Sequence, residues 1–326
     1  MKITLAHGNG GEEMSALIES VFMKHFQNEY VLMEDSAVLP FSGRQLAFTT
    51  DSFVVKPLFF PGGDIGRLAV CGTVNDLLTT GGKPLYLSAS FIIEENMDTV
   101  ALDKVALSMR EAADEAGVLI VTGDTKVIEG SGGLYINTAG VGEAGTASFR
   151  SVGEGDAILV SGSLGDHHAC ILSQRMEIQN TIQSDAAPLV EMVRALVQAG
   201  IPLHGLRDIT RGGLATVLNE AATIASLPAE INEEALPVSD AVRGFCQILG
   251  LDPLYMGNEG KMLVVVPAQY ADKTLELLRK SRYGEGANII GRFSCRAHNV
   301  FVMLNTKIGG QRIIPPLTGE GLPRIC

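Results

Sequence analysis

The sequence has no apolar run that approaches the roughly 18 residues needed to cross a membrane as a helix. Met1-Lys2-Ile3 passes directly into sequence of globular character, so we expect no signal peptide. We therefore expect a soluble, cytoplasmic protein.

Cysteines are few and widely spaced, and basic residues do not cluster. The cysteines are Cys71, Cys170, Cys246, Cys295 and Cys326. Their odd number and irregular spacing argue against disulfides and a zinc site. The formal net charge of −12, without a run of Lys and Arg, argues against nucleic-acid binding. A small anion carried by metal ions remains compatible with this charge.

A length of 326 residues with 46% hydrophobic side chains predicts more than one globular core. The glycine-rich, acidic stretch 142–156 is the best boundary. We expect a mixed α/β protein with domains at 1–150 and 151–306 and a flexible tail at 307–326.

Apolar periodicity predicts alternating strands and helices. The expected strands are 45–51, 86–93, 118–121, 134–141, 157–161, 262–266, 287–293 and 300–304. The expected helices are 12–26, 64–82, 99–116, 188–199, 214–225, 239–249 and 268–279. Such a βαβ rhythm places ligands at the strand ends.

The tail is rich in glycine and proline and ends in Pro323-Arg324-Ile325-Cys326. Fully extended, its twenty residues could span about 65–70 Å. One hypothesis is that Cys326 is a chemical handle on a swinging arm. The alternative is a frayed tail with an accidental cysteine.

Aspartates recur where ligand-binding groups are expected, at element ends or in glycine-flanked turns. They are Asp35, Asp51, Asp76, Asp124 and Asp208. Carboxylates can bind a nucleotide triphosphate only through cations, and Mg²⁺ prefers oxygen ligands. Each aspartate alone is more often an ordinary turn residue.

Two basic segments complete this pattern. Residues 122–127 predict a polar turn at a strand end, in which Lys126 could meet a phosphate as a point charge. Arg211 and Gly212 precede the helix 214–225, whose N-terminus is a plausible anion site.

The order of these motifs resembles the ATP-using superfamily of aminoimidazole ribonucleotide synthetase and selenophosphate synthetase. The motifs are Glu-Asp-Ser-Ala-Val at 34–38, Thr-Thr-Asp-Ser at 49–52, Asn-Asp-Leu-Leu-Thr-Thr-Gly-Gly at 75–82, Thr-Gly-Asp-Thr-Lys at 122–126, Asp-Ile-Thr-Arg-Gly-Gly at 208–213 and Asn-Glu-Gly-Lys at 258–261. His-Gly-Asn-Gly-Gly at 7–11 and the Pro-Arg-Ile-Cys ending narrow the resemblance to the HypE family of hydrogenase maturation factors, the carbamoyl dehydratases.

The resemblance implies a homodimer in which strands of two N-terminal domains close a barrel. ATP and Mg²⁺ would lie in a cleft beside it, covered by a C-terminal α/β domain. The implied metal ligands are Asp35, Asp51, Asp76 and Asp208, and the implied nucleotide contacts are Asp51, Asn75, Asp76, Asp124, Thr125, Arg211 and Gly212.

The resemblance also implies the reaction. The carbamoyltransferase HypF places a carbamoyl group on Cys326, ATP-dependent dehydration converts the thiocarboxamide to a thiocyanate, and the cyano group passes to iron on the HypC–HypD complex. Lys126 would lie near the transferred phosphoryl group, and Glu259 is the candidate for the proton-abstracting base.

Two other interpretations remain. The same scaffold could be a synthetase or small-molecule kinase that makes a soluble phosphorylated metabolite and leaves Cys326 idle. A scaffold whose cysteine binds metal is a poorer fit, because a lone thiol without nearby ligands binds metal weakly.

Overall fold

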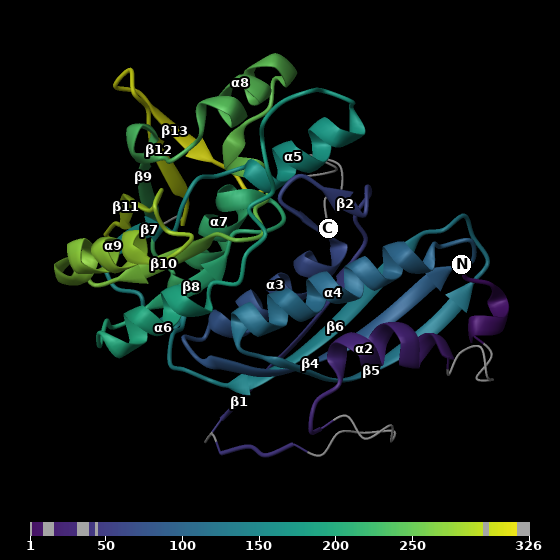
Figure 1. Ribbon diagram of the computed structural model, residues 1–326. Helices are drawn as coiled ribbons and strands as arrows, with labels where there is room; N and C mark the ends of the chain where they lie inside the picture. The colour runs from purple at the N-terminus through teal and green to yellow at the C-terminus, as the bar shows by residue number, and fades with distance from the viewer. Residues whose placement is uncertain (1, 9–15, 31–38, 43–44, 296–299, 318–326) are drawn as a thin grey trace.

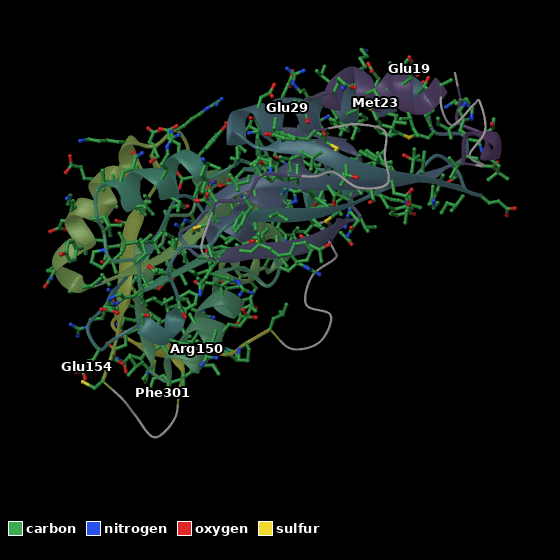
Figure 2. All side chains as sticks on the ribbon, turned by 90° about the horizontal axis from the view of Figure 1, so that it is seen from below. Glu19, Met23, Glu29, Arg150, Glu154 and Phe301 are labelled. Carbon is green, nitrogen blue, oxygen red and sulfur yellow. The ribbon has the colours of Figure 1, made fainter. Side chains whose placement is uncertain are left out.

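The chain forms two lobes, each built around its own β-sheet (Figure 1). The computed structural model describes residues 2–8, 16–30, 39–42, 45–295 and 300–317. Glu19 and Met23 lie at one end of the molecule and Glu154 and Phe301 at the other (Figure 2). The first sheet uses residues 46–143 and the second uses residues 157–314.

The first lobe contains a four-stranded sheet in the order β1-β6-β4-β5. Its strands are β1 (Leu46–Phe53), β4 (Lys83–Glu94), β5 (Leu119–Ile128) and β6 (Leu134–Glu143). Helices α3 (Ile65–Leu78) and α4 (Thr99–Ala116) cover one face (Figure 1). Shorter elements are η1 (Leu5–Gly8), η2 (Ile18–Met23), α2 (Lys24–Phe26), β2 (Phe59–Phe60) and β3 (Gly63–Asp64).

Side chains of this sheet alternate between a helix-covered face and an open face. On β1, Ala47 and Phe53 are buried on the helix side. Leu46 and Phe48 on the other side are 53% and 65% exposed. We call this second side the open face, and Ile92 on β4 also lies there, 43% exposed.

Helix α3 lies between the first sheet and the second lobe. The carboxylate of Asp64 caps its start by accepting hydrogen bonds from the backbone N–H groups of Gly66 and Arg67, at 2.7 and 3.1 Å. Apolar residues surround the helix on all sides, which is typical of a buried helix. Its contacts with α6 and β8 bring Asn75 and Asp76 to the junction of the lobes.

The second lobe is a seven-stranded sheet in the order β13-β12-β9-β11-β7-β10-β8. Its strands are β7 (Ala157–Val160), β8 (Gly205–Asp208), β9 (Ala229–Asn232), β10 (Met262–Val266), β11 (Asn288–Phe293), β12 (Val302–Asn305) and β13 (Gln311–Ile314). Its helices are η3 (Phe149–Ser151), α5 (Asp166–Arg175), α6 (Val190–Gln198), α7 (Gly213–Ala225), η4 (Glu233–Ala235), α8 (Asp240–Leu249), η5 (Pro253–Tyr255), η6 (Ala268–Tyr270) and α9 (Ala271–Lys280). Within the described part of the chain, no helix has the length and apolar character to cross a membrane.

The stretch 122–127 is not a turn, so that prediction is wrong. It continues β5, in which Asp124 pairs with Ser90 and Lys126 with Ile92 along the neighbouring parallel strand. β5 is an edge strand, and an edge tolerates charged and glycine residues that resemble a turn in sequence.

The predicted start of a flexible tail at 307 is also wrong. Residues 311–314 form β13, which pairs antiparallel with β12 after a short turn at 307–310. Ile314 is 1% exposed, and the Tyr255 hydroxyl donates a hydrogen bond of 2.9 Å to the carbonyl oxygen of Pro315. This segment is fixed because the hairpin buries an apolar side chain in the second sheet.

Candidate active site

Three of the predicted aspartates converge at the junction of the lobes. Asp51 lies within β1, Asp76 within α3, and Asp208 is the last residue of β8. Asp51 faces α3, since its carboxylate lies 3.9 Å from the place that a Cβ would take on Gly72. The Thr49 hydroxyl donates a 2.9 Å hydrogen bond to the Asp76 carboxylate. The expectation that Asp51 ends its strand is wrong, because β1 continues to Phe53. Asp76 lies in the last turn of α3, and the packing of α3 on β1 brings the two aspartates together.

Burial and mutual repulsion disfavour the charged forms of these aspartates. Burial, followed by the charge of Asp76, raises the pKa of Asp208 to about 7. Burial also raises the pKa of Asp76 and of Asp51. The guanidinium groups of Arg207 and Arg211 offset part of this effect. A bound cation would relieve the remaining repulsion between these carboxylates.

A cavity of about 500 Å³ opens beside Asp76 and Asp208. Its walls are residues 46–49 of β1, Asp76 in the last turn of α3, Thr80 after that helix, and Arg207 and Asp208 of β8. This volume lies in the usual range of small-ligand sites. Because Phe48 lines the cavity and belongs to the open face, the cavity reaches the edge of that face.

The start of α7 carries free backbone N–H groups. It follows Arg211, whose charge acts on Asp51 and Asp76. Gly212 is its N-cap residue and makes no side-chain capping bond. Gly212 and Gly213 adopt positive φ values of 78° and 62°, which favour glycine. A Cβ on Gly213 would lie 2.5 Å from the Leu254 carbonyl oxygen. Together with Arg211, this helix start can receive a phosphate group.

Glu259 lies in the turn that leads into β10 and is 3% exposed. Burial raises its pKa well above the ordinary value, and the charges of Asp185, Asp208 and Asp51 raise it further. Glu259 therefore lies within electrostatic reach of Asp51, Asp185 and Asp208. A buried carboxyl group beside the other carboxylates is a reasonable proton acceptor for an acid–base step.

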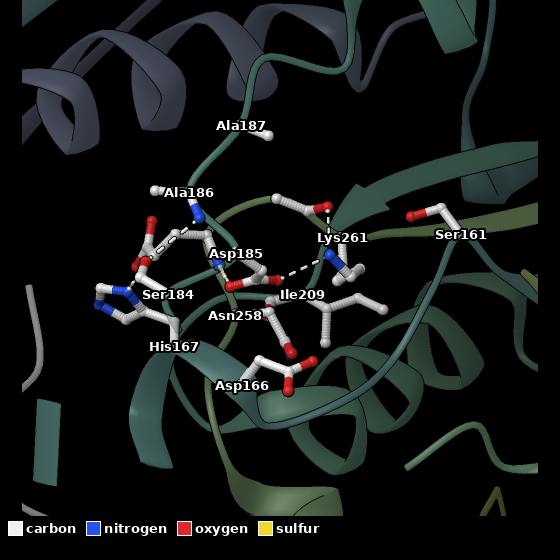
Figure 3. Close-up of polar contacts among 12 residues, drawn as sticks. Ser161, Asp166, His167, Ser184, Asp185, Ala186, Ala187, Ile209, Asn258 and Lys261 are labelled. Atoms are coloured by element: carbon white, nitrogen blue, oxygen red, sulfur yellow. Dashed lines mark hydrogen bonds and ion pairs between the residues drawn. The ribbon is translucent and has the colours of Figure 1, made fainter. Parts of the chain in front are cut away.

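Figure 3 shows a polar network that includes Asp185, Asn258 and Lys261, and the last two residues flank Glu259 in the sequence. Lys261 and Asp185 form an ion pair of 3.1 Å, with side chains 9% and 6% exposed. Nδ2 of Asn258 donates to the Ile209 carbonyl oxygen at 3.0 Å, while its Oδ1 accepts from the Gly165 N–H at 2.7 Å. The turn that carries Glu259 is therefore held by side chains from several segments.

Asn75 uses its side chain for protein structure. Its Nδ2 donates to the Ala187 carbonyl oxygen at 3.0 Å, and its Oδ1 accepts from the Leu189 N–H at 2.9 Å. These bonds tie α3 to the segment before α6. The predicted contact of Asn75 with nucleotide stays a prediction.

The structure does not bring Asp124, Thr125 and Lys126 to the aspartates of the same chain. Asp124 and Lys126 lie on the open face of β5 and form an exposed 3.2 Å ion pair with each other. Thr125 points to the opposite, helix-covered face and is 4% exposed. β5 is the far edge strand from β1, about 14 Å away across three strand spacings.

Sequence reasoning missed Asp185, Arg207 and Thr49 as neighbours of the site. Asp185 gave no signal of its own, because Ser, Asp and Pro are ordinary residues in a loop before a helix. The predicted residues Asp35 and Cys326 lie outside the described residues. In the described ranges, no three His, Cys, Asp or Glu side chains are close enough together to enclose a metal ion.

Comparison with known families defines the class of protein. Residues 33–144 match the AIR synthase related protein N-terminal domain, and residues 153–303 match the corresponding C-terminal domain. The first matched region covers all but the described start of the first lobe and contains its whole sheet, and the second contains the second sheet up to the first half of β12. The expected two-part fold of this superfamily is confirmed.

Individual relatives narrow the class. The chain is 46% identical over 338 residues to the carbamoyl dehydratase HypE of Rhodobacter capsulatus, covering 100% of this chain and 98% of the relative. It is 43% identical over 338 residues to the HypE of Escherichia coli K12, covering 99% of each. The chain belongs to the HypE family of carbamoyl dehydratases, the hydrogenase maturation proteins, as the sequence predicts.

Solved structures agree with this assignment. A HypE structure in complex with ATP matches with a TM-score of 0.94 and 45% identity, covering 99% of each chain. A HypE–HypF complex contains a chain that matches with a TM-score of 0.80 and 47% identity, covering 93% of this chain and 100% of that one. Thiamine monophosphate kinase of Aquifex aeolicus, at 21% identity and a TM-score of 0.60, shares the fold alone.

Proposed function

We propose that this carbamoyl dehydratase acts on Cys326 of its own sequence. It converts a thiocarboxamide on this thiol to a thiocyanate at the expense of ATP, and so supplies cyanide ligands for [NiFe]-hydrogenase iron. The crowded carboxylates of Asp51, Asp76 and Asp208 beside a cavity of about 500 Å³ carry the proposal. Such a site binds a triphosphate when a cation screens the charges.

Asp51, Asp76 and Asp208 would hold Mg²⁺, and Asp35 is a further candidate ligand. The ion supplies charge neutralisation for phosphoryl transfer when it is bound. Arg211 and the Gly212 end of α7 would receive phosphate oxygens. The structure of a HypE relative in complex with ATP supports ATP as the nucleotide.

The reaction removes the elements of one water molecule. The thiocarboxamide oxygen attacks the γ-phosphorus of ATP, ADP leaves, and one proton departs from the nitrogen. Loss of the second nitrogen proton then breaks the C–O bond, which releases inorganic phosphate and leaves S–C≡N. Glu259 takes a nitrogen proton, because its raised pKa makes its carboxylate a stronger base than an exposed glutamate.

Lys126 enters this scheme through a homodimer. Exposed apolar side chains such as Phe48 and Ile92 cover the open face, which favours pairing with a second copy. Because Lys126 and Asp124 share that face, a partner copy could present them to the cavity edge at Phe48. Lys126 would then stabilise the transferred phosphoryl group across the dimer.

The proposal includes the partner proteins and their location. HypF would load the carbamoyl group, as the HypE–HypF complex of a relative suggests. The HypC–HypD complex would receive the cyano group on its iron. These exchanges would take place in the cytoplasm.

Replacement of the thiol tests the proposal. We expect Cys326→Ala to abolish cyanide-ligand formation while Mg·ATP binding stays unchanged, because residues between 46 and 208 build the wall of the described cavity. Cys295→Ala is the matched control, since Cys295 is an exposed free cysteine. Normal cyanide formation by Cys326→Ala would refute the proposal.

A further inference from the structure

The segment 184–189 crosses from the second lobe to α3 and touches the turn that carries Glu259. We call residues 184–189 the strap. The Ser184 N–H donates to the Pro61 carbonyl oxygen at 2.8 Å, and His167 Nδ1 lies 2.7 Å from the Ser184 hydroxyl (Figure 3). Nε of Arg67 donates to the Ala186 carbonyl oxygen at 2.7 Å. Together with the Asn75 bonds, these contacts fix the strap from both lobes.

Asp185 is the strap residue that reaches the Glu259 turn. Its Oδ1 accepts a 3.0 Å hydrogen bond from the Glu259 backbone N–H. Its Oδ2 lies 3.1 Å from the ammonium group of Lys261. Asp185 therefore holds the turn on both sides of Glu259. The Ala187 N–H also donates to the Glu259 carbonyl oxygen, at 3.3 Å.

The strap lies against the turn without intervening side chains. A Cβ on Gly260 would lie 1.9 Å from the Asp185 carbonyl oxygen, so this position admits no larger residue without a shift. On the other side, a Cβ on Gly162 would lie 2.8 Å from the Lys261 side chain. These close approaches make the position of the Glu259 backbone depend on the strap.

A buried ion pair contributes little net stability, because desolvation of two charges offsets their attraction. Stability alone therefore does not account for Asp185 and Lys261 at 6% and 9% exposure. The buried pair is accounted for if Asp185 serves as a rigid hydrogen-bond acceptor for the backbone N–H of Glu259. Proton transfer needs the base within hydrogen-bond reach of the proton that it removes. Lys261 then balances the charge of that acceptor.

We propose that Asp185 is a positioning residue for the dehydration, which fixes the backbone of Glu259 through the strap and couples it to α3. The inference rests on the proposed role of Glu259 as the base. Asp185 itself touches no reacting atom in this scheme.

Two double variants separate the acceptor from the charge. Asp185→Asn/Lys261→Met removes both charges and keeps an oxygen for the Glu259 N–H. Asp185→Ala/Lys261→Met removes the same charges and the oxygen. Each is carbamoylated on Cys326, and the single-turnover rate of dehydration and the Kd of Mg·ATP are measured. Should the alanine variant fail to fold, Asp185→Ser/Lys261→Met replaces it, because serine is too short to reach the N–H.

We expect the asparagine variant to dehydrate at least roughly tenfold faster than the alanine variant, with similar Kd values for Mg·ATP. Equal single-turnover rates in the two double variants, alongside an inactive Glu259→Gln, would overturn the positioning role and leave the proposed function intact. A wild-type rate in Glu259→Gln would overturn both the base assignment and the inference.

Discussion

Asp208 combines deep burial with two neighbouring carboxylates, and this combination has a cost for the protein without ligand. Its pKa of about 7 is above the ordinary value of 3.8, so stability present at low pH is lost as the pH rises through 7. The negative charge on Asp208, which would bind a cation, therefore destabilises the fold when no cation is bound.

Asp208→Asn should separate these effects. We expect the ligand-free variant to melt a few degrees higher than wild type at pH 8, because the buried charge is gone. Mg·ATP binding and turnover should be lost. Differential scanning calorimetry with and without Mg·ATP measures both, and Asp272→Asn is the control, because Asp272 is an exposed residue of α9. Retained turnover would remove Asp208 from the metal site.

His168 predicts a second dependence on pH, of opposite sign. Burial lowers its pKa from 6.5 to about 4, and its Nδ1 accepts a 3.3 Å hydrogen bond from the Gly257 N–H. The unfolded chain binds this proton below pH 6.5, so the free energy of unfolding should fall between pH 6.5 and 4. The expected loss is about 3 kcal/mol. Urea unfolding across this range checks it, and His168→Gln should flatten the slope.

At the scale of residues, the sequence predicts which family of site is present better than it predicts where the side chains of that site lie. The order of Asp51, Asp76, Asp208 and Glu259 along the chain predicts an ATP-using family. That Lys126 and Asp124 lie on the other face of the sheet was not predictable, because side-chain direction on β5 depends on where the strand ends. Asp185 acts through a backbone N–H, which leaves no clear motif.

At the scale of elements, long periodic segments were predicted well. The helix expected at 99–116 is α4 within the same bounds, closed by Gly117 at a φ of 69°. Short strands were missed, as with β9 at 229–232 and β13 at 311–314. A segment of four residues shows too little alternation of apolar and polar side chains to distinguish a strand from a loop. Whether it becomes a strand depends on pairing with neighbouring strands of the sheet.

Gly260 tests the contact between strap and turn. We expect Gly260→Ala to lower the free energy of unfolding by about 1–3 kcal/mol, because its Cβ would overlap the Asp185 carbonyl oxygen. Dehydration should fall in parallel. Gly244→Ala in α8 is the matched control, since no atom lies within 4 Å of its new Cβ. Thermal unfolding compares the two variants, and equal midpoints would contradict the close contact.

At the scale of the whole molecule, the open face carries the proposed dimer. Phe48→Asp places a charge on this face and should convert the dimer to a monomer of intact fold. Ile248→Asp on α8 is the control, because Ile248 is 82% exposed on the other lobe. Light scattering reports the mass of each variant. A dimeric Phe48→Asp protein would contradict the assignment of the interface.

If each site of the dimer combines Asp208 of one copy with Lys126 of the other, variants of the two residues should complement each other. Lys126→Ala and Asp208→Asn should each be inactive alone. Mixed dimers of the two variants should recover activity, because one of their two sites combines an intact Asp208 with the partner's intact Lys126. Absence of recovery in mixed dimers would place Lys126 outside the site.

The central claim is that the carbamoyl oxygen on Cys326 leaves as phosphate. The most direct measurement follows a heavy-oxygen label from the carbamoyl group of the loaded protein after Mg·ATP is added. The account predicts that the label appears in inorganic phosphate while the Cys326 peptide changes in mass from carbamoyl to cyano. Unlabelled phosphate, with the carbamoyl group still on Cys326, would contradict it.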